Sequence, residues 1–175
     1  MSRNKESERS MRQHEKLVEK EKNSNGFKCQ HCGEWIYSVP ELMGTRHRNH
    51  CPYCLWSKHM DHEKQGDRES SCKAGMRPIG LTLKKEGINS FSGRPKKGEL
   101  MLVHECQRCG KVSINRLAGD DISEIVLAMF KESLNLPKEV VLRLAKDGID
   151  LLIEKDTNLV ISMLSVKDFI KLGKI

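Results

Sequence analysis

The cysteines are the residues most able to do chemistry, because six of the seven occur in pairs separated by two residues. In chain order the seven are Cys29, Cys32, Cys51, Cys54, Cys72, Cys106 and Cys109. A tight turn over a C-x-x-C segment aims both sulfurs at one ion, and the 18 residues between the first two pairs fit the spacing of zinc sites. An odd number of cysteines excludes complete disulfide pairing within one chain. The pattern therefore predicts structural zinc held by thiolates.

Two tetrahedral zinc sites need eight donors, so we expect a histidine to join the seven thiolates. His59, five residues after Cys54, is the preferred candidate, and the rivals are His50, His62 and His104. The preferred partition has one site of Cys29, Cys32, Cys51 and Cys54 and a second site of His59, Cys72, Cys106 and Cys109. The alternative joins Cys29 and Cys32 to Cys106 and Cys109, and leaves Cys51, Cys54, His59 and Cys72 together. Spacing does not choose between them, and each predicts two Zn²⁺ ions.

The first residues, MSRNKESERSMRQHEK, lack the apolar stretch of a secretory signal peptide. No apolar run reaches the roughly 20 residues that span a bilayer. We therefore expect a cytoplasmic protein with no membrane partner. In that reducing compartment a high density of cysteines indicates metal binding rather than disulfides.

Composition divides the chain into a charged mobile arm (1–25), a cysteine-rich domain (26–118) and an extension (119–175). The cysteine-rich part carries 16 Lys and Arg against 9 Asp and Glu, whereas the extension carries 8 against 10. We expect a small α+β fold that is stabilised by zinc. Its first part should consist of short β-hairpins and zinc knuckles, similar to a zinc ribbon, and a small α-rich extension should follow. The aromatic residues near the first two pairs are expected to cover the zinc knuckles.

Helical spacing of apolar residues predicts one helix over about 120–134 and a second that starts near Pro137 and ends at Asp147-Gly148. The segments around Asp156-Thr157-Asn158 suggest a hairpin, with a helix as the alternative. A capping box at 165–168 predicts the start of a short final helix. No catalytic constellation occurs in this extension, so we expect it to serve packing or interaction.

The central stretch resembles the RNHCP family, a bacterial domain family named after the motif that stands here as Arg48-Asn49-His50-Cys51-Pro52. The resemblance covers about residues 26–121, including His104-x-Cys106-x-x-Cys109-Gly110 and Asp120-Asp121, and it departs at Met60, where valine is expected. It implies a zinc-binding fold in which all seven cysteines are ligands. It implies no particular reaction.

Basic charge and aromatic residues in the cysteine-rich part favour RNA binding, and ribosomal RNA within the ribosome is one candidate ligand. Phosphates attract such surfaces, and aromatic rings stack on unpaired bases. The rings in question are those of Trp35, Tyr37, Tyr53 and Trp56, and residues 91–98 suggest a basic loop. The predicted RNA-binding residues are Arg46, Arg48, Lys58, Lys84, Lys85, Arg94, Lys96, Lys97, Arg108 and Lys111.

Two other functions are alternatives on the sequence alone. One is a protein–protein interaction adaptor that docks through the α-rich extension. The other is a metal-dependent nuclease with His50 as its base, although His50 could equally orient a loop by hydrogen bonding. Because a catalytic zinc needs an open coordination position and the donors here fill both sites, we do not expect an enzyme.

Overall fold

The computed structural model describes residues 26–45, 47–64, 66–84 and 98–172, with side chains as far as residue 165. The arm at 1–25 and most of the predicted basic loop at 91–98 lie outside this part of the chain. The α+β architecture, with short antiparallel strands, two cysteine-rich clusters and C-terminal helices, confirms the predicted fold class.

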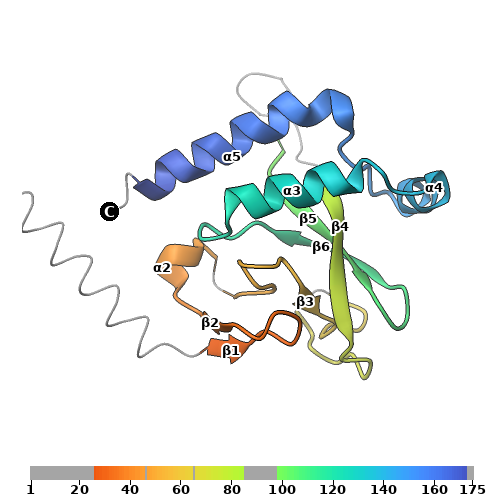
Figure 1. The fold of residues 1–175 in the computed structure, drawn as a ribbon. Coiled ribbons are helices and arrows are strands. Elements are labelled where there is room, and N and C mark those ends of the chain that lie inside the picture. The colour runs from red at the N-terminus through yellow and green to blue at the C-terminus, as the bar shows by residue number, and fades with distance from the viewer. Residues whose placement is uncertain (1–25, 46, 65, 85–97, 173–175) are drawn as a thin grey trace, which may run out of the picture.

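Two antiparallel sheets carry the cysteine-rich part (Figure 1). The smaller sheet pairs β1 (Gly26–Lys28) with β2 (Trp35–Tyr37), and a short helix α2 (Pro40–Met43) follows it. The larger sheet has the order β3-β4-β5-β6. Its strands are β3 (Ser57–Lys58), β4 (Gly75–Leu83), β5 (Leu100–Cys106) and β6 (Val112–Arg116).

Strand β5 is buried along almost its whole length because both faces of the sheet are covered. Leu102 belongs to a core beneath α3 (Ser123–Ser133) and α5 (Thr157–Leu172), whereas the neighbouring Val103 packs in a second core with Leu144 of α4 (Lys138–Lys146). Successive side chains of a strand point to opposite faces. The helices therefore cover both faces of the sheet, with α3 and α5 on one and α4 on the other (Figure 1).

The structure confirms the first two helices of the extension and corrects the prediction for the residues after them. Residues around Leu151 make an isolated bridge to Thr82, a 3-10 turn η1 (Glu154–Asp156) comes next, and α5 begins at Thr157. The predicted hairpin is therefore wrong, and the helical alternative holds. The capping box is also wrong, because the Ser165 hydroxyl donates to the Ile161 carbonyl at 2.9 Å inside α5. Val160 and Leu164 are spaced four residues apart, as on one face of a helix, and both are buried in the main core. The secondary-structure preferences of the individual residues did not reveal this.

The boundary drawn by composition at 118/119 does not coincide with a break in packing. The main core contains Leu55, Leu81 and Leu102 from the cysteine-rich part. It also contains Val126, Phe130 and Val160 from the extension, all fully buried. The sheet and the helices therefore share one core, because neither layer buries its apolar face alone.

Candidate metal centres

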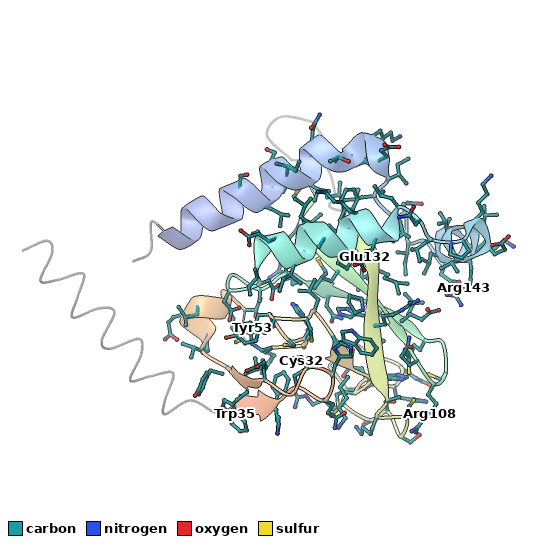
Figure 2. The ribbon with its side chains drawn as sticks, viewed as in Figure 1. Cys32, Trp35, Tyr53, Arg108, Glu132 and Arg143 are labelled. Atoms are coloured by element: carbon teal, nitrogen blue, oxygen red, sulfur yellow. The ribbon has the colours of Figure 1, made fainter. Side chains whose placement is uncertain are left out.

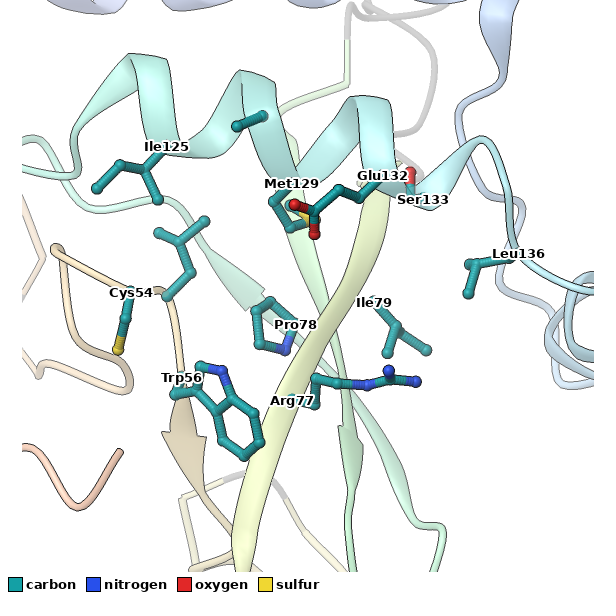
Figure 3. Close-up of a pocket in the computed structure, with 12 residues that line it drawn as sticks. Cys54, Trp56, Arg77, Pro78, Ile79, Ile125, Met129, Glu132, Ser133 and Leu136 are labelled. Carbon is teal, nitrogen blue, oxygen red and sulfur yellow. The ribbon is translucent and has the colours of Figure 1, made fainter. Parts of the chain in front are cut away.

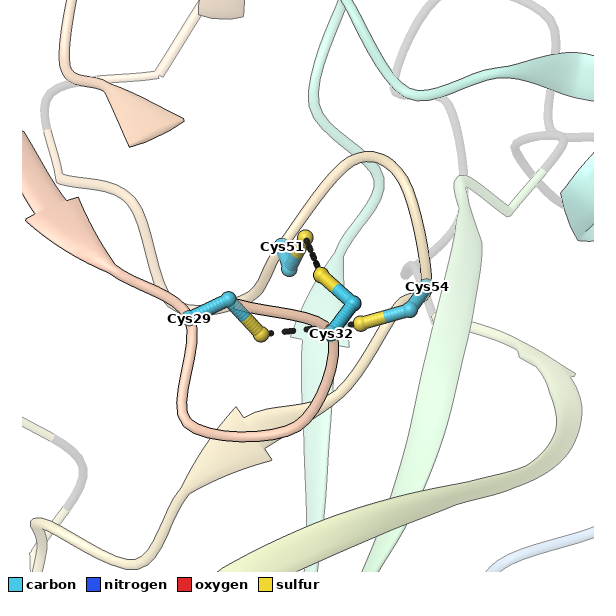
Figure 4. A group of neighbouring side chains, drawn as sticks. All are labelled: Cys29, Cys32, Cys51 and Cys54. Carbon is cyan, nitrogen blue, oxygen red and sulfur yellow. Dashed lines mark hydrogen bonds between the residues drawn. The ribbon is translucent and has the colours of Figure 1, made fainter. Parts of the chain in front are cut away.

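The first centre consists of Cys29, Cys32, Cys51 and Cys54, whose ligand atoms all lie within 4.8 Å of one another. The sulfurs of Cys29 and Cys54 are 3.6 Å apart, as are those of Cys32 and Cys51 (Figure 4). These separations exclude disulfides, and all seven cysteines are free. Tetrahedral zinc with Zn–S bonds of about 2.3 Å places its sulfurs about 3.8 Å apart. The four thiols therefore fit a zinc ion.

Tight turns aim these sulfurs. The amide of Gly33 donates to the Cys29 carbonyl at 3.0 Å, with Gly33 at φ +81°. The amide of Leu55 donates to the Cys51 carbonyl at 2.8 Å in the same way. Leu55, however, holds φ +60° without being glycine, and its side chain is fully buried in the main core. The second turn is therefore tied to the core by a residue that accepts a left-handed backbone.

The second centre consists of His59, Cys72, Cys106 and Cys109. The Cys72 and Cys106 sulfurs are 3.6 Å apart, and the Cys109 sulfur lies 3.3 Å from His59 Nδ1. The other imidazole nitrogen, Nε2, lies 3.1 Å from the Asp61 carbonyl, which fixes the ring and directs Nδ1 to the ligand position. Gly110 has φ +72°, and its backbone amide donates a hydrogen bond to the Cys106 carbonyl, as the Gly33 amide does to the Cys29 carbonyl.

This grouping is the preferred partition and not the crossed one. The rival histidines lie elsewhere: His50 and His104 make buried hydrogen bonds, and His62 is exposed. Both groups consist only of Cys and His donors and supply four each, so each could hold a zinc ion with no position open for substrate. Burial raises the pKa of the Cys51 thiol to about 11, so zinc must displace a proton there.

A buried polar network links the first centre to the sheet and to the start of α3. His50 Nε2 donates to Asp121 Oδ2 at 2.9 Å, and the same oxygen accepts from the Ala118 amide at 2.7 Å. His104 donates from Nε2 to the Leu55 carbonyl at 2.7 Å, and its Nδ1 accepts from Asn115 Nδ2 at 3.0 Å. Burial, with the neighbouring His50, lowers the pKa of His104 to about 3, which keeps it neutral for this arrangement.

The Arg48-Asn49-His50 part of the motif thus holds the fold together. The Arg48 side chain is 1% exposed and pairs with Asp120. The prediction that Arg48 contacts RNA is therefore wrong, because its charged group does not reach the surface. Asn115 and Asp121 belong to the stretch that resembles the family, but sequence reasoning gave Asn115 no role and placed Asp121 only at the start of a helix. The sequence signal that could have revealed these partners was the acidic pair Asp120-Asp121. It lies too far along the chain from the Arg48-Asn49-His50 segment for spacing to link the two.

The remaining predicted RNA contacts that the structure describes are divided between the two ends of strand β4. Lys58, Lys84 and Arg108 are exposed, and Lys111 is half-buried. Of these four, Arg108 is labelled in Figure 2. Gly75, at the start of β4, lies next to the second centre. Lys84 follows the other end of β4 and is therefore remote from that centre. The others, Arg46, Lys85, Arg94, Lys96 and Lys97, lie outside the described residues.

The aromatic residues near the first two cysteine pairs differ in how far they are exposed to solvent. Phe27, Trp35, Tyr37 and Tyr53 are between 38% and 51% exposed. Trp56 is half-buried and stacks on His31 with ring centroids 4.0 Å apart. Trp56 therefore packs on the knuckle that contains His31, whereas the other four rings have a large part of their surface in solvent.

None of the helices in the described part of the chain is long and apolar enough to cross a membrane.

No curated protein and no solved structure matches the chain. The family model for the RNHCP domain matches residues 24–127, which include all eight candidate ligands and the start of α3. Since that match covers more than half of the sequence, the chain belongs to the RNHCP domain family.

Proposed function

We propose that this RNHCP protein uses its two zinc centres to hold a surface that binds RNA in the cytoplasm. The observation that carries the proposal is a group of cations beside the second centre. Its members are exposed or half-buried and lie on the ligand-bearing loops or, for Lys58, at the end of β3 next to His59. We call this group the basic rim: Lys58, Arg68, Lys73, Arg108 and Lys111. Phosphates would attract these charges and release their counterions on contact.

Hydrogen bonds hold several members of the basic rim in place. Lys73 Nζ donates to the Arg68 carbonyl at 3.0 Å, and Arg108 Nη1 donates to the Cys72 carbonyl at 2.9 Å. Lys111 Nζ donates to the Asp61 carbonyl at 3.3 Å. These bonds tie the cations to the ligand loops, so a folded second centre is required to present them together.

Acidic residues of the same loop bond to its backbone. Asp61 accepts from the amides of Gly66 and Arg68, at 2.8 and 3.2 Å. Asp67 accepts from four amides, of which those of His62 and Lys64 lie at 2.8 Å. These backbone donors hold the pKa of Asp67 well below its usual range. The two carboxylates thus shape the loop, and backbone dipoles compensate part of their charge.

Lys84 marks a second basic end. Strand β4 runs from Gly75 beside the second centre to Leu83 just before Lys84, a rise of about 26 Å at about 3.3 Å per residue. The sequence after Lys84 adds Lys85, Arg94, Lys96 and Lys97. An RNA that contacts both ends would therefore have to follow the long β4–β5 hairpin.

The test uses the full-length, zinc-loaded protein and labelled RNA, with binding followed by fluorescence anisotropy over a range of salt concentrations. Affinity should fall steeply with salt, and Lys58→Glu should reduce the slope of log K against log salt by about 1. Lys146→Glu, the same charge change on an exposed position of α4, is the matched control and should leave binding unchanged. Salt-independent binding, or equal losses in both variants, would contradict the proposal.

Association with ribosomes is the finer form of the proposal. Ultraviolet crosslinking of the tagged protein in cells should yield discrete positions in ribosomal RNA. Sedimentation of the same lysate at low and high salt should show co-migration with ribosomal particles at low salt only. Migration as a small species without crosslinks would remove the ribosome from the proposal.

A cleft between α3 and β4 favours protein docking as the second candidate (Figure 3). It has a volume of about 310 Å³, and its apolar lining includes Trp56, Pro78, Ile79 and Met129. Ala128→Arg would fill it from the exposed face of α3. Loss of a salt-resistant protein partner in this variant, with RNA binding retained, would favour the adaptor function.

Catalysis finds little support in the position of His50. Its ring is 2% exposed and bonded to Asp121, so it does not reach a phosphodiester in this conformation. The proposal therefore gives it a structural role. Metal-dependent cleavage of RNA or DNA that is lost in His50→Ala with zinc retained would contradict this assignment.

A further inference from the structure

The exposed apolar side chains divide by chemical type between the two parts of the chain. Among the described residues, the large ones in the cysteine-rich part are all aromatic: Phe27, Trp35, Tyr37 and Tyr53. Those of the extension are all aliphatic, with Leu142 and Ile161 as examples. Aliphatic side chains suit docking on protein, whereas every nucleobase has a π-face that stacks on an aromatic ring.

Two of these rings share one face of the β1–β2 hairpin. In β2 the side chain of Ile36 is 2% exposed and packs with Cys29 and Cys51, so Trp35 and Tyr37 on either side of it point outward. Trp35 is 51% exposed and Tyr37 38%. Figure 2 shows Trp35 at the outer edge of the molecule, on the side away from α3.

Gly26 holds the Trp35 ring against the hairpin. It pairs with Tyr37 across the sheet, and a Cβ added to it would lie 2.8 Å from the Trp35 Nε1 and 2.4 Å from the Ile36 carbonyl oxygen. The indole therefore lies close against bare backbone, in space that only glycine leaves. A ring supported in this way loses little conformational freedom when a ligand stacks on it.

A cation lies beside the two rings. Lys28 pairs with Trp35 in the register of the hairpin, is exposed, and belongs to the same face. A nucleotide stacked on the indole would place its phosphate within reach of this flexible ammonium group. Aromatic rings beside a positive charge are the combination that binds single-stranded nucleic acid without strong sequence preference.

We propose that Trp35 and Tyr37, with Lys28, form a stacking platform for unpaired bases. This inference rests on the proposed RNA-binding function and narrows its ligand to single-stranded or looped RNA. Duplex RNA keeps its bases stacked inside the helix and contacts only the basic rim. The first zinc centre, through Cys29, holds the hairpin that carries the platform.

The test compares Trp35→Leu/Tyr37→Leu, which removes both rings, with Trp35→Phe/Tyr37→Phe, which keeps aromatic faces. Both are made in the full-length, zinc-loaded protein, and the probes are oligouridine and an RNA duplex of equal length. The leucine variant should lose about tenfold in oligouridine affinity for each ring, with duplex affinity within about twofold of the parent. The phenylalanine variant should retain most of the oligouridine affinity. Zinc content must match in all proteins.

A second readout monitors the ring directly. In a Trp56→Phe background Trp35 is the only tryptophan, and stacking of a base should quench its emission as oligouridine is added. Unchanged oligouridine affinity in the leucine variant, equal losses for both RNAs, or absence of quenching would overturn the platform. If the parent protein binds neither RNA, the proposed function itself fails, which separates the two conclusions.

Discussion

The first metal centre lies beside a two-stranded hairpin, whereas the second closes the end of the four-stranded sheet. Four thiolates leave zinc with two net negative charges, and three thiolates with a neutral imidazole leave one. Aromatic rings surround the more negative centre, and the basic rim surrounds the less negative one. Equivalent turns can thus present different surfaces, because the ligands fix the loops and leave the outward side chains free.

The two centres also differ in how much core supports them. The core at the first centre consists of Cys29, Ile36 and Cys51, with Cys54 packed against it. The second centre includes Cys106, the last residue of β5, and that strand is buried beneath the helices. A short hairpin without a sizeable core is not stable in water. The first hairpin should therefore depend most on its metal.

The largest expected effect comes from removing one ligand at each centre. Cys51→Ala and Cys106→Ala should each lower the zinc content from two ions to one, as measured by native mass spectrometry. In Cys51→Ala, hydrogen exchange of β1 and β2 should become as fast as in an unfolded chain. In Cys106→Ala, β4 and β5 should keep most of their protection, because their core does not contain the metal. Equal loss in both hairpins would contradict the difference in core support.

The next effect concerns the network that connects the first centre to α3. Asp121→Ala should lower the free energy of unfolding by about 3 kcal/mol, because it leaves buried His50 without its partner. Urea unfolding at fixed free zinc measures this, with Asp147→Ala at the exposed end of α4 as the control. A loss no larger than that of the control would show that the network contributes nothing to stability.

A smaller effect should appear at Leu55, where the first centre meets the main core. Leu55→Ala loses a buried side chain and keeps the left-handed backbone, while Leu55→Gly loses the side chain but relieves the strain. We expect a loss of about 3 kcal/mol for alanine and about 2 kcal/mol for glycine. The reverse order in urea unfolding would mean that φ +60° carries no strain here.

The smallest effect tests whether the two centres share one turn. Gly33→Ala and Gly110→Ala should each cost about 1 kcal/mol, because both glycines have positive φ and a Cβ there would meet no atom within 4 Å. The cost is therefore purely conformational. Competition with a chelator, with zinc affinity as the readout, should give equal losses at the two positions. Asparagine at either position should cost less, since it tolerates this backbone.

Local spacing predicted the three C-x-x-C pairs and the two helices after residue 119. Cys72 and His59 were added to these pairs because two tetrahedral sites need eight donors. Two of the C-x-x-C turns end in a glycine, Gly33 or Gly110, a residue that readily adopts a left-handed backbone. The third ends in Leu55, and its left-handed backbone was not predicted because leucine rarely adopts that conformation. The final helix was mistaken for a hairpin because its apolar residues also fit short strands.

Which ligands share an ion was left to the tertiary structure, since spacing along the chain allowed both partitions. Only the fold brings Cys29 near Cys54, and Cys72 near Cys106. The fold also decided the meaning of the Arg48-Asn49-His50 motif, because its partners, Asp120, Asn115 and Asp121, lie about 70 residues further along the chain. Residue type therefore determined which side chains can bind metal or charge, and folding determined which of them meet and which reach the solvent.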